Sequence, residues 1–160
     1  MKKLLCIFSL LLLVGCSNAT SIKPTTRNLS FLAEITYYNE FYEISAEISQ
    51  NGEMTIKILQ PDDLKDIVFT ITENDIKSEF NGITYEYTSP HQSDVISFIY
   101  NAFKEENPKV LENDNEFFIK GKFDDFEYKM FIGQSGLPLK IVDSSGRFNV
   151  LFKNPTIKNK

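Results

Sequence analysis

Cysteine, histidine and tryptophan are scarce in this chain of 160 residues, which has two cysteines, one histidine and no tryptophan. So few thiol and imidazole groups exclude both a disulfide framework and a zinc site of the Cys/His type. The one histidine, His91, stands beside Pro90 at an expected helix start, where we expect a solvated side chain. A serine nucleophile therefore has no histidine partner, and the sequence predicts no metal centre and no cofactor.

Long hydrophobic runs and clusters of basic residues are missing as well. The longest apolar stretch, Leu4–Val14, is too short for a membrane-crossing helix, which needs about 20 residues. The net charge is −5, and beyond Lys2-Lys3 the lysines stand singly along the chain. Nucleic acid is therefore not expected as a partner. The negative balance also argues against electrostatic adhesion to anionic lipid.

Carboxylates do occur in pairs, the arrangement that general acid–base catalysis uses. The pairs are Asp62-Asp63, Glu105-Glu106 and Asp124-Asp125. Each lies at an expected turn or helix end, where solvated carboxylates are usual, and none is embedded in an apolar stretch that would shift its pKa. No glycine-rich phosphate loop accompanies them. The sequence therefore predicts a protein that is not an enzyme.

The N-terminus has the pattern of a bacterial lipoprotein signal. Lys2 and Lys3 precede the apolar run, and the run ends in Leu13-Val14-Gly15-Cys16, which resembles a lipobox. A thiol is needed to accept diacylglycerol, and the small Gly15 gives a peptidase access to the bond before it. The alternative is an ordinary signal peptide with an incidental cysteine. We favour cleavage after Gly15 and lipid on Cys16.

This pattern divides the chain and places it in the cell. Residues 1–15 are expected to be a signal peptide, 16–28 the lipidated cysteine with a flexible polar tether, 29–154 the folded domain and 155–160 a C-terminal tail. We expect a protein held by lipid on the extracytoplasmic face of the cell membrane. Frequent Lys, Asn and Ile suggest a Gram-positive host.

Alternating apolar and polar residues dominate the chain from Ser30 onward, which is typical of antiparallel strands with one buried face. Strands are expected at 31–37, 42–49, 54–58, 67–71, 83–87, 117–122, 126–132, 139–141 and 148–152. The Asn51-Gly52 and Asn81-Gly82 steps fit tight hairpin turns. The pattern predicts about ten strands.

One segment has helical spacing instead. Ser89 is a candidate N-cap, and Pro90 takes the first helical position. Apolar residues then recur every three or four positions until Asn107-Pro108 ends the run. The sequence predicts one amphipathic helix from Pro90 to Glu106.

Together these elements predict a mainly β (α+β) domain, a curved antiparallel sheet or unclosed half-barrel of about 8–11 strands around one amphipathic helix. About ten strands make a sheet ~45 Å wide, whereas a helix is only ~10 Å across. Either the sheet curls until its own side chains fill the interior, or part of the inner face stays open as a groove. The residues expected to line this groove or core are Ile56, Ile58, Phe69, Ile71, Tyr85, Tyr87, Ile96, Ile99, Phe103, Tyr128, Met130, Phe148 and Phe152.

Three stretches resemble the LolA/LolB/RseB superfamily of envelope proteins: FLAEITYYNEFYEISAEI, GEMTIKILQPDDLKDIVFTI and GLPLKIVDSSGRFNVLFKN. Within it, the chain is most similar to small clostridial LolA-like lipoproteins, including the GerS-like lipoproteins of spore germination. The resemblance implies an unclosed β-barrel with helical lids. It also implies either an apolar ligand or, for the germination proteins, docking of a cell-wall amidase.

Two functions remain open on this basis. The protein is either a membrane-tethered module that binds an envelope protein, such as a cell-wall hydrolase, or a cradle for a lipid or other apolar ligand. Large inward side chains are expected to fill a small half-barrel and leave little room for acyl chains. We therefore favour the protein-binding module. A cradle should instead expose bulky apolar residues on the inner face, and a docking module should expose strand edges or a loop patch.

Overall fold

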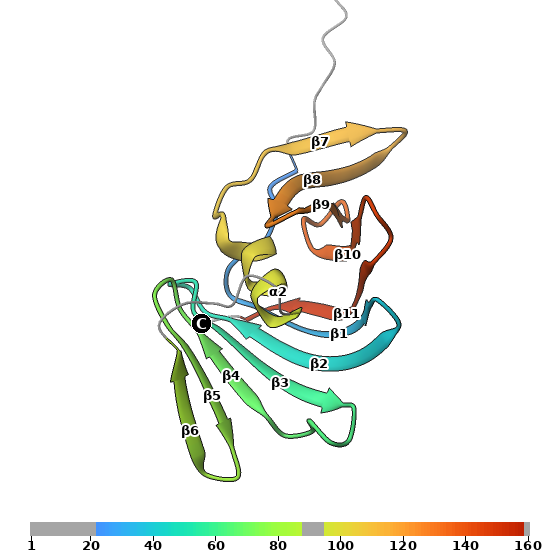
Figure 1. The fold of residues 1–160 in the computed structure, drawn as a ribbon. Coiled ribbons are helices and arrows are strands. Elements are labelled where there is room, and N and C mark those ends of the chain that lie inside the picture. The colour runs from blue at the N-terminus through green and yellow to red at the C-terminus, as the bar shows by residue number, and fades with distance from the viewer. Residues whose placement is uncertain (1–21, 88–94, 159–160) are drawn as a thin grey trace, which may run out of the picture.

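The computed structural model of the protein describes residues 22–87 and 95–158. Within them, one antiparallel sheet of eleven strands curves around a single helix, α2 (Val95–Lys104) (Figure 1). The strands are β1 (Leu29–Tyr37), β2 (Glu40–Ile48), β3 (Met54–Gln60), β4 (Val68–Ile71), β5 (Ile76–Phe80), β6 (Ile83–Tyr87), β7 (Val110–Asn113), β8 (Glu116–Phe123), β9 (Phe126–Ile132), β10 (Pro138–Asp143) and β11 (Phe148–Ile157). The prediction of an unclosed, mainly β sheet around one helix is confirmed.

The sheet consists of two meanders joined at its centre. Strands β1 to β6 follow one another in space on one side, and β7 to β11 do so on the other. The two meanders meet where β1 pairs with β11, so the first and last strands lie in the middle. Strands β6 and β7 form the two edges of the sheet.

A row of apolar side chains crosses five neighbouring strands and marks the inner face, which is the face that α2 covers. Ile35 lies opposite Val150, Val150 opposite Ile141, Ile141 opposite Met130, and Met130 opposite Ile119. All five side chains are buried. Because the side-chain period of a strand is two, the residues between them point to the outer face.

Helix α2 packs on this inner face through aromatic rings. The ring of Phe98 lies 3.8 Å from that of Phe148 and 5.1 Å from that of Tyr128, centroid to centroid. One turn along, the ring of Phe103 stacks on Phe31 at 5.4 Å. Ile99, between them, is fully buried. These contacts hold the helix over β1, β11 and β9, from the centre of the sheet toward its β7 edge.

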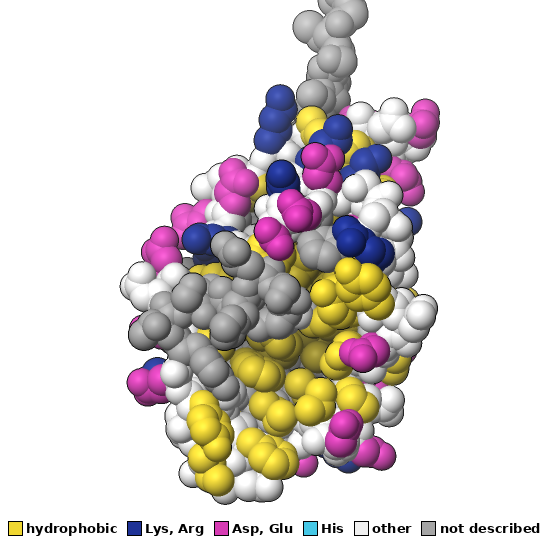
Figure 2. All heavy atoms as spheres, viewed as in Figure 1, with side chains coloured by type: hydrophobic (Ala, Val, Ile, Leu, Met, Phe, Trp, Pro, Cys, Tyr) yellow, Lys and Arg dark blue, Asp and Glu magenta, His cyan; other side chains and the backbone are white. Residues whose placement is uncertain are grey.

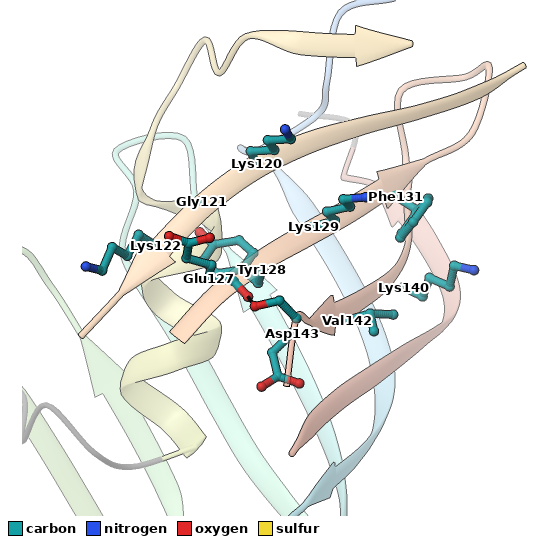
Figure 3. Close-up of a pocket in the computed structure, with 11 residues that line it drawn as sticks. Lys120, Gly121, Lys122, Glu127, Tyr128, Lys129, Phe131, Lys140, Val142 and Asp143 are labelled. Carbon is teal, nitrogen blue, oxygen red and sulfur yellow. Dashed lines mark hydrogen bonds between the residues drawn. The ribbon is translucent and has the colours of Figure 1, made fainter. Parts of the chain in front are cut away.

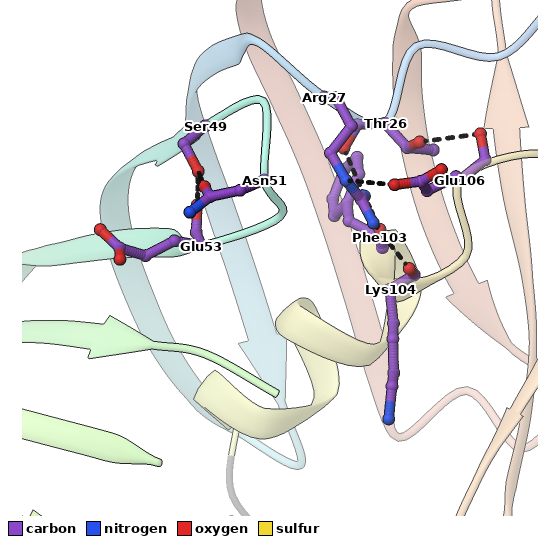
Figure 4. A network of polar contacts seen from close by, with 8 residues as sticks. All are labelled: Thr26, Arg27, Ser49, Asn51, Glu53, Phe103, Lys104 and Glu106. Atoms are coloured by element: carbon purple, nitrogen blue, oxygen red, sulfur yellow. Dashed lines mark hydrogen bonds and ion pairs between the residues drawn. The ribbon is translucent and has the colours of Figure 1, made fainter. Parts of the chain in front are cut away.

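Residues 22–28, predicted as the second half of the tether, lie against the domain instead. Thr26 is buried, and its hydroxyl donates to the carbonyl oxygen of Glu106 at 3.2 Å. Arg27 donates to the carbonyl oxygens of Phe103 at 2.7 Å and Lys104 at 2.9 Å (Figure 4). Helix ends leave such carbonyls without intrahelical partners, so a guanidinium satisfies them and also complements the helix dipole.

Replacing Arg27 by Met should therefore destabilise the domain. The variant keeps most of the apolar stem but loses two charge-assisted hydrogen bonds to the C-terminus of α2, each worth about 1.5–3 kcal/mol. We expect the free energy of unfolding in urea to fall by about 2–3 kcal/mol. Lys23→Met, in the same segment, is the matched control and should change it by less than about 0.5 kcal/mol. Equal effects of the two changes would contradict the capping role.

The strand prediction missed β5 and β7, and the reason is local. Strand β5 reads IKSEF, which places Ser78 on the inner face, and β7 has only four residues and forms an edge. Neither has the apolar alternation that revealed the other strands. At the C-terminus, β11 continues to Ile157, which lies opposite Leu29, so it extends into the predicted tail.

The turns and the ends of the helix also differ in part from those predicted from the sequence. Asn81 and Gly82 both have positive φ, as the predicted two-residue turn requires. At the Asn51-Gly52 step, only Gly52 has a positive φ. It lies in a longer turn that is closed by hydrogen bonds between Ser49 and Glu53. Helix α2 ends at Lys104 rather than Glu106, where Arg27 caps it. Its predicted start, with Ser89, Pro90 and His91, lies outside the described residues.

Candidate ligand-binding surface

Most of the inward residues expected from the sequence form the core beneath α2. Their side chains are buried and pack into one continuous cluster. They are Ile56, Ile58, Ile71, Ile96, Ile99, Phe103, Tyr128, Met130, Phe148 and Phe152. Over the centre of the sheet the interior is therefore filled by the protein's own side chains.

The other three expected residues lie toward the β6 edge of the sheet. A cross-strand row runs from Ile56 through Phe69 and Ser78 to Tyr85, and Ser78 is buried like Ile56. Ile56 is fully buried, Phe69 is half-buried, and Tyr85 is 56% exposed. The side chain of Tyr87 lies outside the described part of the chain. Among the described residues, the ring contacts of α2 are with β1, β8, β9 and β11, and Tyr85 on the edge strand β6 is the exposed end of the row.

Two further apolar side chains extend this exposed region. Phe80 is 39% exposed and Ile83 is 56% exposed, and they lie opposite each other across the Asn81-Gly82 turn. The register places both on the inner face, together with Tyr85 and Phe69. We call these four residues the β4–β6 apolar surface. Figure 2 shows hydrophobic side chains gathered over this lower part of the molecule.

Phe80 and Ile83 are not among the residues predicted to line the groove, although the sequence carries a signal for both. A two-residue Asn-Gly turn places the residues on either side of it directly opposite each other. Since Ile83 alternates with Tyr85, Phe80 had to share their face. Recognising β5 as a strand would have been sufficient to include Phe80.

The tyrosines with shifted pKa values do not provide acid–base groups for neutral pH. Burial raises the pKa of Tyr128 to about 12, and the charge of Glu105 adds to the shift. For Tyr42, the hydrogen bond to the Glu40 carboxylate raises the pKa to about 12. Both phenols stay protonated and neutral under physiological conditions. The arrangement can bind an apolar group but gives these tyrosines no means of moving a proton near pH 7.

The paired carboxylates named in the sequence are exposed, as expected. Among the described residues, no group of three or more His, Cys, Asp or Glu side chains could hold a metal ion. Within the same ranges, no helix is both long and apolar enough to span a bilayer. The lipobox residues Leu13, Val14, Gly15 and Cys16 lie outside the described ranges.

No protein-family model matches the sequence, and no curated protein matches it either. Among solved structures, an uncharacterized conserved protein from Thermus thermophilus aligns with a TM-score of 0.54 at 12% identity, over 82% of this chain and 79% of its own. This likeness shows a shared fold.

Other solved structures align with lower TM-scores. A LolA superfamily protein from Nitrosomonas europaea has a TM-score of 0.47 at 10% identity, over 89% of this chain and 91% of its own. A putative outer membrane lipoprotein-sorting protein domain from Vibrio parahaemolyticus has a TM-score of 0.45 at 8% identity, over 88% of this chain and 89% of its own.

Proposed function

We propose that the protein is a non-catalytic binding protein whose β4–β6 apolar surface takes an apolar ligand, such as the acyl chain of a lipid. One observation carries this proposal: Phe80, Ile83 and Tyr85 are exposed together on the inner face of a single hairpin. Clustered exposed apolar side chains commonly mark ligand or partner sites. An acyl chain lying here would continue the core that begins at Phe69.

The same observation reverses the preference drawn from the sequence for a protein-binding module. Large inward side chains do fill the half-barrel, and on this side of the sheet the buried cluster extends to Ile71 of β4 and Ile76 of β5. Toward the β6 edge, bulky apolar residues face inward and stay exposed, as a cradle requires. The predicted module keeps one supporting feature, since β6 is a sheet edge that could pair with an extended segment of an envelope protein such as a cell-wall hydrolase.

Ile83→Asp should weaken binding of a fluorescent fatty acid by about 10- to 50-fold. The change removes a side chain whose burial is worth about 1.5–3 kcal/mol and places a charge against the chain of the ligand. Tenfold corresponds to about 1.4 kcal/mol. The measurement is a fluorescence titration of the purified protein, with the circular dichroism spectrum recorded to confirm that the variant is folded.

Phe41→Asp is the matched control for this titration. Phe41 is 47% exposed and lies on the outer face of β2, opposite Thr36. Its replacement should leave the affinity within about twofold. Equal losses in both variants would contradict the proposed surface. Absence of fatty-acid binding together with capture of an envelope protein by the β6 edge would support the module instead.

We also propose that lipid on Cys16 holds the protein at the extracytoplasmic face of the cell membrane in a Gram-positive host. The lipobox-like sequence before Cys16 supports this anchor. Two acyl chains give stable attachment, because each buried methylene contributes about 0.8 kcal/mol. With Cys16→Ala, we expect the protein to leave the membrane fraction or to keep its uncleaved signal. An anchored, processed variant of unchanged mass would contradict the assignment.

A further inference from the structure

Four lysines gather around a hollow on the outer face of β8–β10, the face opposite α2. The hollow has a volume of about 820 Å³ and is lined by Lys120, Lys122, Lys129 and Lys140 among other residues (Figure 3). We call these four residues the lysine face. They are exposed, except that Lys140 is half-buried.

Strand register brings these lysines together from separate places in the sequence. Lys120 of β8 lies directly opposite Lys129 of β9. Lys140 of β10 lies opposite Phe131, two residues along β9 from Lys129. Like charges directly opposite each other destabilise a strand pair. The Lys120–Lys129 pair is therefore unfavourable unless an anion lies nearby.

The lysine face lacks the carboxylate partners that other lysines of the sheet have. Lys57, Lys77 and Lys153 each form an ion pair with a carboxylate. Among the described residues, none of the four lysines forms such a pair. The hollow also contains two carboxylates. Asp143 is buried and accepts hydrogen bonds from the amide of Phe148 and the hydroxyl of Ser145, whereas Glu127 is exposed and lies directly opposite Lys122, so one carboxylate faces the four lysines. The surface thus carries excess positive charge in a chain whose net charge is −5.

Apolar groups accompany the charges, as in surfaces that rest on a membrane. The Lys140 ammonium lies 4.3 Å from the ring centroid of Phe131, and that of Lys129 lies 5.1 Å from Phe118. Leu151, directly opposite Lys140, is an exposed large apolar residue. Long cationic side chains over apolar groups suit the boundary between lipid headgroups and acyl chains.

The described residues that follow the predicted anchor lie against the turn between β9 and β10. The amide of Thr25 donates to the carbonyl oxygen of Gly136 at 2.9 Å, in the turn between β9 and β10. A Cβ atom on Gly136 would lie 2.1 Å from the carbonyl oxygen of Lys23, so the segment fits closely there. From Cys16 to Ile22 the chain can span at most about 20 Å. Lipid on Cys16 would therefore hold β9 and β10 close to the bilayer.

We propose that the lysine face binds the phosphates of anionic lipid headgroups and so orients the domain on the membrane beside its anchor. This site is distinct from the β4–β6 apolar surface and does not depend on a ligand there. It departs from the expectation that the negative net charge argues against adhesion to anionic lipid. The attraction depends on local charge, because screening limits it to about 10 Å at 0.1 M salt.

Lysine footprinting of the full chain tests this proposal. The protein is mixed with excess vesicles of 30% phosphatidylglycerol in phosphatidylcholine, or of phosphatidylcholine alone, and treated with an amine-acetylating reagent. On the anionic vesicles we expect acetylation of Lys120, Lys129 and Lys140 to slow about fivefold, and to recover in 0.5 M salt. Lys65, an exposed lysine between β3 and β4, is the internal control and should be acetylated at the same rate on both kinds of vesicle.

Two results would overturn the proposal. One is equal acetylation of the three lysines on both kinds of vesicle. The other is the same protection by 20 mM inorganic phosphate with neutral vesicles, which would indicate a site for soluble anions. Lys120→Gln combined with Lys129→Gln should abolish the protection of Lys140, whereas Lys65→Gln should leave it intact.

Discussion

Ile99→Asp should leave the domain largely unfolded. Ile99 lies in the middle of α2, is fully buried, and belongs to the apolar cluster between the helix and the sheet. A carboxylate there would have no partner, and an unpaired buried charge destabilises a protein by about 4–5 kcal/mol or more. Domains of this size have a total stability of about 5–15 kcal/mol. The expected loss therefore approaches the whole stability.

Urea denaturation followed by circular dichroism measures this effect. Ile99→Val is the control, because it removes one methylene and should lower the free energy of unfolding by only about 1 kcal/mol. If Ile99→Asp unfolded with a free energy within about 1 kcal/mol of the native chain, the helix could not lie inside the curved sheet.

Gly121→Ala should destabilise the domain by about 3 kcal/mol, although alanine is normally the better residue in a strand. The new Cβ atom would lie 2.1 Å from Cζ of Tyr128, whose ring covers Gly121 from the neighbouring strand. Tyr128 is buried, and its ring packs against Phe98. The ring cannot move aside without disturbing the contact with α2.

A double-mutant cycle isolates this contact. Tyr128→Leu removes the distal ring atoms that the new methyl group would meet. In that background, Gly121→Ala should lower the free energy of unfolding by less than about 1 kcal/mol. Additive effects of the two changes would show that the clash with Tyr128 is not the cause.

The sequence was sufficient for the fold class because the signals for most strands and for the helix are local. Alternation in residues 31–37 and 148–152 identified β1 and β11, and helical spacing identified α2. Pairing of β1 with β11 needed the structure, since the two strands stand at opposite ends of the domain. The hydrogen bond from Arg27 to the carbonyl oxygen of Lys104 could not be predicted from the sequence either, because it joins residues far apart in the chain.

The candidate site could be predicted only in part, for a similar reason. Alternation assigns Tyr85 to the inner face, but it does not show whether a helix covers that part of the face. The lysine face depends on register as well. A slip by one residue between β8 and β9 would place Lys120 and Lys129 on opposite faces. Isolated lysines in the sequence therefore gave no sign of a cluster.

Photo-crosslinking tests the central claim, an acyl chain on the inner face of β4–β6, most directly. The purified protein is irradiated with a fatty acid that carries a diazirine near its methyl end, and labelled residues are identified by mass spectrometry. We predict labels on Phe69, Phe80, Ile83 and Tyr85, and their loss in Ile83→Asp but not in Phe41→Asp. Labels spread over the outer face, or unchanged in Ile83→Asp, would contradict the account.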